Sequence, residues 1–194
     1  MKKLTLALMG LLIASAAFAQ EPAAVRGKAS ATIGGKTVTV DYGQAKLKGR
    51  AFDELLKGLG PDRMWRTGEN QVTTINTAGP LLVGGKAVPA GKYSIYVHIG
   101  EGDNDSLILN KNLGIPLIKI WAQAPANLAN EPWPALNGYN NVASEELIRV
   151  PLTKASNPKP VDPFSMTLTP RDAGATLTLA WGDKSFSTEI AAGK

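Results

Sequence analysis

The run Trp-Arg-Thr-Gly-Glu-Asn at positions 65–70 carries the side chains best suited to chemistry in this chain. The guanidinium of Arg66 offers five donors in a rigid fork, which suits a carboxylate, a phosphate or a pair of sugar hydroxyls. Trp65 beside it could stack on a sugar face, although strand neighbours point to opposite faces, so one of the two is expected in the core. The structural alternative is that Arg66 braces loop carbonyls or pairs with Glu69, and that the glycine and asparagine hold a bend with positive φ.

A second candidate for chemistry is His98, the single histidine of the chain. Any Ser-His-Asp arrangement would need it. Alternation places Ser94 and Tyr96 on the same face of its predicted strand, which is either a polar pocket or a solvent-facing surface. With one histidine and no cysteine a structural zinc site is not expected. The acidic turn at 101–105 lacks the calcium-loop spacing and is interpreted as a plain turn, so no metal or cofactor is assigned.

The segment 122–144 is rich in proline, asparagine and alanine and has no clear period, so we expect a long ordered loop. Exposed aromatic residues in it would form a contact surface for a carbohydrate or a protein. The alternative is a hydrophobic lid that closes one end of the fold. The candidate ligand-binding residues of the whole chain are Trp65, Arg66, Thr67, Glu69, Asn70, His98, Trp133 and Tyr139, and no catalytic residue is assigned.

The elements that must position these residues are nearly all strands. About ten short strands separated by turns, with at most one short helix, predict an all-β fold, an antiparallel β-sandwich or jelly roll. The expected helix lies at 53–59 with Asp53 as its N-cap, and a stiff Pro-rich connection is expected at 157–160. Strands are expected at 29–33, 36–42, 72–77, 81–83, 87–88, 93–99, 106–110, 115–121, 146–152, 164–169, 176–181 and 185–190, with turns at 172–174 and 182–183.

The N-terminus has the three regions of a secretory signal: two lysines, an apolar run and a small-x-small cleavage site ending at Ala19. We therefore expect a signal peptide at 1–19, a flexible mature N-terminus at 20–28, and a single domain at 29–192 that includes the long loop. The expected location is the periplasm or the outside of the cell, with no membrane span after cleavage. The net charge of +5 is not gathered into a basic run, so no nucleic-acid partner is expected.

In its most distinctive residues the chain resembles the bacterial domain-of-unknown-function family 2911. The resemblance rests on the 65–70 block, on Lys48-Gly49-Arg50 and Phe52 before it, and on Gly-Gly-Lys…Pro-Ala-Gly-x-Tyr at 84–93 after it. It covers about residues 30–190 and implies a secreted protein, with no activity attached. The family typically has Asn and then Glu at the end of this block, whereas here Gln71 stands where the acid is expected.

Three hypotheses about function follow. The first is a non-enzymatic binding module of the cell envelope, whose ligand is a glycan or a protein contacted by Arg66, Asn70 and the aromatic residues of the long loop. The second is a hydrolase of unknown substrate that uses His98 or a pair of loop acids among Asp162, Asp172 and Asp183. The third is a structural or assembly role in which Trp65 and Arg66 serve only the fold. The oligomeric state is not predicted.

Overall fold

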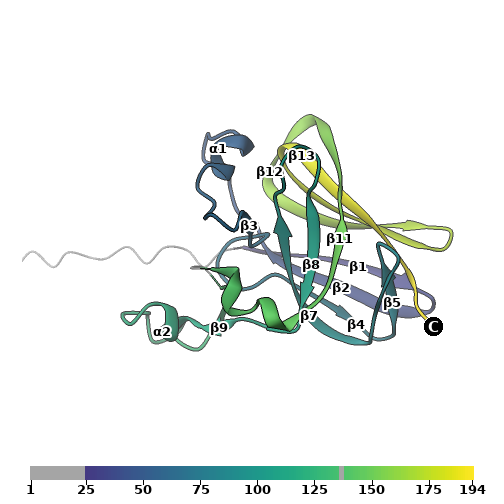
Figure 1. Cartoon of the computed structure of the whole chain (residues 1–194), viewed down its shortest axis with the longest axis horizontal. Helices are drawn as coiled ribbons and strands as arrows, with labels where there is room; N and C mark the ends of the chain where they lie inside the picture. The colour runs from purple at the N-terminus through teal and green to yellow at the C-terminus, as the bar shows by residue number, and fades with distance from the viewer. Residues whose placement is uncertain (1–24, 136–137) are drawn as a thin grey trace, which may run out of the picture.

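The computed structural model describes residues 25–135 and 138–194, and two antiparallel sheets in it enclose one hydrophobic core (Figure 1). This confirms the predicted all-β sandwich. In spatial order the larger sheet contains β1 (Arg26–Ile33), β2 (Lys36–Gly43), β4 (Thr74–Thr77), β7 (Gly91–His98), β8 (Ser106–Asn110) and β11 (Glu146–Pro151), and β3 (Met64–Trp65) also pairs with β7. The smaller sheet contains β12 (Thr153–Arg171), β13 (Gly174–Ala192), β5 (Leu81–Val83) and β6 (Lys86–Val88).

Short helical turns and a small ribbon complete the described part of the chain. The ribbon pairs β9 (Ile115–Pro116) with β10 (Pro132–Trp133). The helical elements are α1 (Phe52–Leu56), α2 (Leu117–Ile120), and the 3-10 turns η1 (Tyr139–Asn141) and η2 (Ala143–Glu145). None of the helices in residues 25–135 and 138–194 is both long and apolar enough to cross a membrane.

The first hairpin forms where the sequence predicts it, because two strands of alternating polarity flank a two-glycine turn. The turn residues Gly34 and Gly35 have φ values of 54° and 73°, which glycine reaches without steric cost. Val38 and Val40 of β2 are fully buried, as the alternation predicts. β1 begins at Arg26, so the three residues before the predicted domain boundary at 29 already pair with β2.

The last two strands correct the predicted end of the domain. Instead of three short strands after a stiff connection at 157–160, β12 and β13 form one hairpin of two 19-residue strands. The predicted turn at 182–183 lies inside β13. Asn157 holds the strands together here, because its side-chain nitrogen donates to the carbonyl oxygen of Gly182 at 3.0 Å. The register shifts on both sides of Val161, so this region bends the ribbon without ending it.

Aromatic side chains form the centre of the core at the end of the sandwich nearest α1. The rings of Trp65 and Trp181 stack at 6.0 Å with an angle of 11° between their planes. Phe52 of α1 lies edge-on to both rings, at 5.7 Å from Trp65 and 6.1 Å from Trp181. Phe164 and Phe186 pack against the same group. This group therefore joins α1 to both sheets.

Helix α1 is shorter than the predicted helix at 53–59 and starts one residue earlier. The backbone N–H of Ala51 donates to the carboxylate of Glu54 at 3.1 Å, so Ala51 and not Asp53 is the N-cap residue. The helix is a single short turn held by its buried residue, Phe52. The loop on either side of it lies over the end of the sandwich as a strap, here defined as residues 45–62.

The clearest alternation in the sequence, at 93–99, does not produce a polar or solvent-facing side. Ser94 and Tyr96 are both buried, with exposed fractions of 0% and 1%. Tyr96 packs in a second apolar cluster with Tyr139 and Val142, which come from η1 and the start of η2. The prediction of one open face on β7 was therefore wrong, because a distant segment of the chain covers it.

The predicted strand at 115–121 is mostly helical. Only β9 is extended, and the backbone N–H groups of Leu117 and Ile118 then donate to the carbonyl oxygens of Glu131 (3.1 Å) and Ala129 (2.9 Å). These bonds close a compact arm of β9, α2 and β10 that extends from the sandwich below α1 in Figure 1. The segment 122–144 predicted as a long loop thus contains β10, η1 and most of η2.

Candidate functional site

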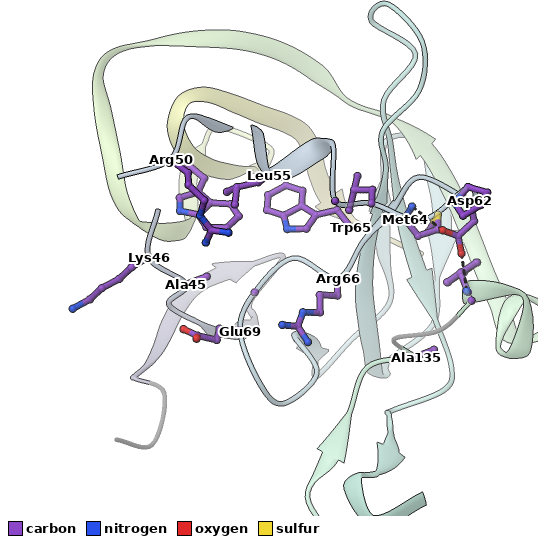
Figure 2. Close-up of a pocket in the computed structure, with 18 of the residues that line it drawn as sticks. Ala45, Lys46, Arg50, Leu55, Asp62, Met64, Trp65, Arg66, Glu69 and Ala135 are labelled. Carbon is purple, nitrogen blue, oxygen red and sulfur yellow. Dashed lines mark hydrogen bonds between the residues drawn. The ribbon is translucent and has the colours of Figure 1, made fainter. Parts of the chain in front are cut away.

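A cleft of about 740 Å³ opens at the end of the sandwich where the 65–70 block lies. One side of the cleft is the strap with α1, and the opposite side is the chain around Ala135 and Tyr139. The signature residues Trp65, Arg66 and Glu69 line the space between them (Figure 2). Three residues of the sequence motif therefore face a cleft.

A rigid backbone bend positions Arg66. Thr67 has a φ of 53° and Gly68 a φ of 154°, which L side chains rarely adopt. The buried Thr67 side chain donates to the carbonyl oxygen of Ile95 at 2.9 Å, and its own carbonyl accepts from the Thr73 hydroxyl at 2.7 Å. A Cβ at Gly68 would lie 2.8 Å from that hydroxyl, so only glycine fits. The bend is thus fixed to β7 and to the start of β4.

Trp65 is a core residue and only its edge reaches the cleft. Its exposed fraction is 7%, and its ring faces are covered by the other aromatic residues of the core. Trp65 and Arg66 point to different surroundings, core and cleft, as neighbouring positions on a strand predict. Trp181 of β13 also lines the cleft, and its indole nitrogen is buried with no hydrogen-bond partner in the described residues.

Arg66 is half-buried in the cleft wall, and within residues 25–135 and 138–194 no hydrogen bond or ion pair reaches its guanidinium. Burial lowers the pKa of Arg66, and the negative charge of nearby Glu69 only partly offsets that effect. The charged form is thus less well stabilised than in water. Figure 2 shows the guanidinium directed into the open space below Trp65. The expected brace to loop carbonyls is not formed by the described residues.

Other charged side chains surround the opening unevenly. The guanidinium of Arg50 lies across the space from Arg66, and its Nε donates to the carbonyl oxygen of Leu47 at 3.0 Å (Figure 2). Lys46 lines the rim but extends away from the cleft, as Figure 2 also shows. Glu69 makes no ion pair with a described residue, although its charge acts on Arg66. The charged side chains that line the cleft are thus the basic Lys46, Lys48, Arg50 and Arg66 and the acidic Asp62 and Glu69.

Asp62 connects the two sides of the cleft. One carboxylate oxygen accepts from the backbone N–H of Met64 at 3.3 Å, and the other accepts from the backbone N–H of Tyr139 at 2.9 Å. Both oxygens are thus engaged with protein donors. This acid is interpreted as a positioning residue that fixes the width of the cleft.

Tyr139 is buried, and its hydroxyl is fully engaged within the fold. It donates to the carboxylate of Glu146 at 3.1 Å and accepts from the side-chain nitrogen of Asn110 at 3.1 Å. Burial, followed by the charge of Glu146, raises the pKa of Tyr139 despite the bond from Asn110. Its ring forms an edge contact with Tyr96 at 5.1 Å. Tyr139 therefore acts as part of the cleft wall.

The remaining candidate residues do not line the cleft. Thr67 is buried beneath the bend, and Asn70 completes the bend with a φ of 61°. His98 ends β7, where it is half-buried and pairs with Met64 and Ser106. Trp133 belongs to β10 and pairs with Ile115 in the arm. The structure thus brings together Trp65, Arg66, Glu69 and Tyr139 and separates the other four from them.

The acidic turn at 101–105 is an internal brace. The buried carboxylate of Asp105 accepts from the backbone N–H of Gly100 at 3.1 Å and lies 3.0 Å from the ammonium of Lys154. Within the described residues no group of three or more His, Asp or Glu side chains has the arrangement of a metal site.

Much of the cleft is not evident from the sequence. Arg50 lies in the Lys-Gly-Arg run that supports the family resemblance, so a signal existed without a role attached to it. Leu55 and Leu59 lie within the helix expected at 53–59, which carried no functional role. Trp181 comes from the far end of the chain, and no local pattern links it to residues 65–70.

Searches among curated proteins and among solved structures gave no match. The model of the family described as "Protein of unknown function (DUF2911)" matches residues 24–190, which is most of the chain. The match includes both the cleft and the bend of the 65–70 block. The chain therefore belongs to the DUF2911 family, as its signature residues indicated.

Proposed function

We propose that this protein is a non-enzymatic binding protein of the cell envelope whose cleft holds an anionic ligand against Arg66. The observation that carries the proposal is the half-buried guanidinium of Arg66, which no described residue pairs. Removing a cation from water is unfavourable unless hydrogen bonds or an opposite charge compensate for it. An oxyanion in the cleft supplies both, through short charge-assisted bonds to the planar fork.

The rigidity of the bend supports this proposal. The backbone on the C-terminal side of Arg66 is fixed through Thr67 and Gly68 before any ligand is bound. A site that is already ordered loses little conformational entropy on binding, so more of the interaction energy appears as affinity. Asp62 adds to this order by joining the opposite walls.

The surroundings of Trp65 bear on the choice of ligand. Stacking of a sugar needs a free aromatic face, and the faces of Trp65 are occupied by Trp181 and Phe164. Among the glycan and protein ligands expected from the sequence, the cleft suits those that present an acidic group. Arg66, and not Trp65, is therefore proposed as the main ligand contact.

The geometry gives less support to the two other hypotheses. His98 does not line the cleft, and neither do the loop acids Asp162, Asp172 and Asp183, so no pair of proton-transfer groups faces Arg66 from these positions. A purely structural role for Arg66 would need partners for its five donors within the fold. The location in the envelope rests on the predicted signal at 1–19, which lies outside the described residues, and cell fractionation tests it.

The proposed function is tested by thermal unfolding of the purified protein with a panel of anions. The panel contains acetate, octanoate, inorganic phosphate, sulfate and acidic oligosaccharides, and the same panel is applied to Arg66→Gln. A ligand that binds only the folded state at 100 times its Kd stabilises it by about 2.7 kcal/mol, or by roughly 5–10 °C at this chain length. Lys46→Gln is the matched control, since it removes one positive charge from the rim and leaves Arg66 in place.

The expected result is a rise in melting temperature with at least one anion for the wild type and Lys46→Gln, and none for Arg66→Gln. Equal stabilisation of the wild type and Arg66→Gln by every anion would contradict the proposal, because the anion would then bind elsewhere.

A further inference from the structure

The cleft is much larger than the anion that Arg66 would bind. A carboxylate or phosphate group fills about the space of two or three water molecules, each about 30 Å³. The cleft measures about 740 Å³, within the range of about 300–1,000 Å³ that is usual for sites of small organic ligands. The charged group therefore accounts for a minor part of the space, and the rest must accommodate the body of the ligand.

Apolar side chains line the part of the cleft next to α1. Leu55 and Leu59 of the strap are half-buried and line the cleft, as does Met64 of β3. The edges of Trp65 and Trp181 complete this wall. An apolar group bound there would remove these surfaces from water, which favours binding.

A buried hydrogen-bond donor lies in the same wall. The indole nitrogen of Trp181 is buried and has no acceptor among the described residues. Trp181 as a whole is 92% buried, and it lines the cleft. A buried donor without a partner is unfavourable, and native structures contain few of them. This observation is independent of Arg66 and places an unpaired donor in a residue that lines the cleft.

The charges that line the cleft favour an anionic ligand. The basic side chains of Lys48, Arg50 and Arg66 line it together with the carboxylates of Asp62 and Glu69, and both oxygens of Asp62 accept hydrogen bonds from the backbone. The positive charges exceed the negative ones, so the attraction of an oxyanion to the guanidinium groups is only partly offset.

We infer that the ligand of this cleft is an amphiphile: one oxyanion attached to an apolar group that packs on Leu55 and Leu59. The inference rests on the proposed function and names the ligand class for the same site. A free carboxylic acid with an aliphatic chain and a peptide ending in an apolar residue share this chemistry.

Matched probes separate the two parts of the ligand. Isothermal titration calorimetry of the purified protein at pH 8 compares octanoate with acetate, which lacks the chain, and with octanamide, which lacks the charge. Octyl phosphate is compared with inorganic phosphate, and this second pair tests the chain on an oxyanion that carries close to two charges at this pH. A short peptide ending in leucine, with a free or an amidated terminus, distinguishes a peptide from a free acid as the source.

Octanoate is expected to bind at least ten-fold more tightly than acetate, since each buried methylene contributes a factor of about four. It is also expected to bind at least ten-fold more tightly than octanamide, and octyl phosphate should exceed inorganic phosphate by the same factor, because only the octyl compound has the chain. Arg66→Gln should weaken octanoate at least ten-fold, and Leu59→Ala should weaken octanoate several-fold while leaving acetate unchanged. Lys46→Gln should bind like the wild type.

The failure of the inference and the failure of the proposed function give different results. If acetate or inorganic phosphate binds as tightly as octanoate and depends on Arg66, the inference is overturned and anion binding stands. If octanamide binds as tightly as octanoate, or no probe depends on Arg66, the proposed function is overturned as well.

Indole N–H signals in a ¹⁵N NMR spectrum place the bound probe without relying on a variant. The chain has four tryptophans, two at the cleft and two in or next to the arm. Octanoate should shift the signals of Trp65 and Trp181 and leave those of Trp121 and Trp133 unchanged. Shifts confined to Trp121 and Trp133 would overturn the inference, because the apolar group would then lie on the arm.

Discussion

Arg26 in β1 and Arg66 directly after β3 are both half-buried arginines, and their surroundings are opposite. Arg26 forms a salt bridge with Asp41 and donates to the carbonyl oxygens of Gln71 and Val72, both at 3.2 Å. It thereby joins β1, β2 and the segment before β4. Arg66 has none of these partners and faces a cleft. Arg26 is thus used by the fold, whereas the donors of Arg66 have no acceptor among the described residues.

The difference gives a criterion for proposing that an arginine binds a ligand. Both residues are arginines and both are half-buried. What separates them is whether the five donors of the guanidinium find acceptors within the fold. The predictions below test this distinction, beginning with the residue that holds the cleft itself together.

The largest effect is expected for Phe52→Ala, which removes the anchor of the strap. Phe52 is 2% exposed and contacts Trp65, Trp181 and Phe186. Truncation of a buried phenylalanine costs about 3–5 kcal/mol. Urea denaturation measures the loss. A cost below about 1 kcal/mol would show that the strap is held by other contacts.

Arg26→Ala is expected to lower the free energy of unfolding by about 2 kcal/mol, because it removes charge-assisted bonds to three partners. This corresponds to a fall in melting temperature of roughly 4–8 °C. Anion binding in the cleft should persist, since Arg26 does not line it. Loss of binding in a folded Arg26→Ala variant would erase the distinction between the two arginines.

Asp62→Ala removes the acceptor that joins the two walls and is expected to cost about 1–2 kcal/mol, the net value of two hydrogen bonds. Anion affinity should fall although the Arg66 side chain remains, because the wall carrying Tyr139 is no longer fixed. Calorimetry checks this with Asp53→Ala as the control, an exposed acid in α1 that lies outside the cleft. Equal affinities for the two variants would contradict a positioning role for Asp62.

Glu146 predicts a small dependence of stability on pH. Burial raises the pKa of Glu146, but the bonds from Arg149 and Tyr139 outweigh it, and the pKa is lowered from its ordinary 4.5. A carboxyl with a lowered pKa in the folded state adds stability above its unfolded value, and the stability is lost as the pH falls below it. Glu146→Gln should therefore flatten the fall in melting temperature below about pH 4.5. An unchanged acid slope would exclude Glu146 as its source.

The fold was predictable from the sequence where short-range signals act alone. The Gly34–Gly35 turn and the alternation in β2 specify the first hairpin, and the structure agrees. At β7 the same alternation gave the wrong result for Ser94 and Tyr96, because the chain around η1 covers that face. In β12 and β13, proline and glycine residues suggested breaks, but both strands continue there. The side chain of Asn157 in β12 donates hydrogen bonds to two carbonyl oxygens of β13 at this point. Such long-range contacts leave no periodic trace.

The candidate site was predictable in its centre and not in its walls. Arg66 and Glu69 belong to a compact run whose residue types indicate anion recognition, so sequence reasoning reached them. Leu59 and Trp181 became part of the cleft only through the position of the strap and the pairing of β13. Trp133 was expected beside Arg66 because it is aromatic and lies in a long loop, but its pairing with β9 holds it in the arm.

The central claim is that Arg66 serves a ligand and not the fold. The most direct test is the melting temperature of Arg66→Gln beside that of the wild type, each with and without octanoate. Without the anion, the account predicts a change of about 1 °C or less, or a slight rise, because the variant loses only an unpaired charge. With the anion, only the wild type should gain stability. A fall on the order of ten degrees without ligand would show that Arg66 is structural and would contradict the account.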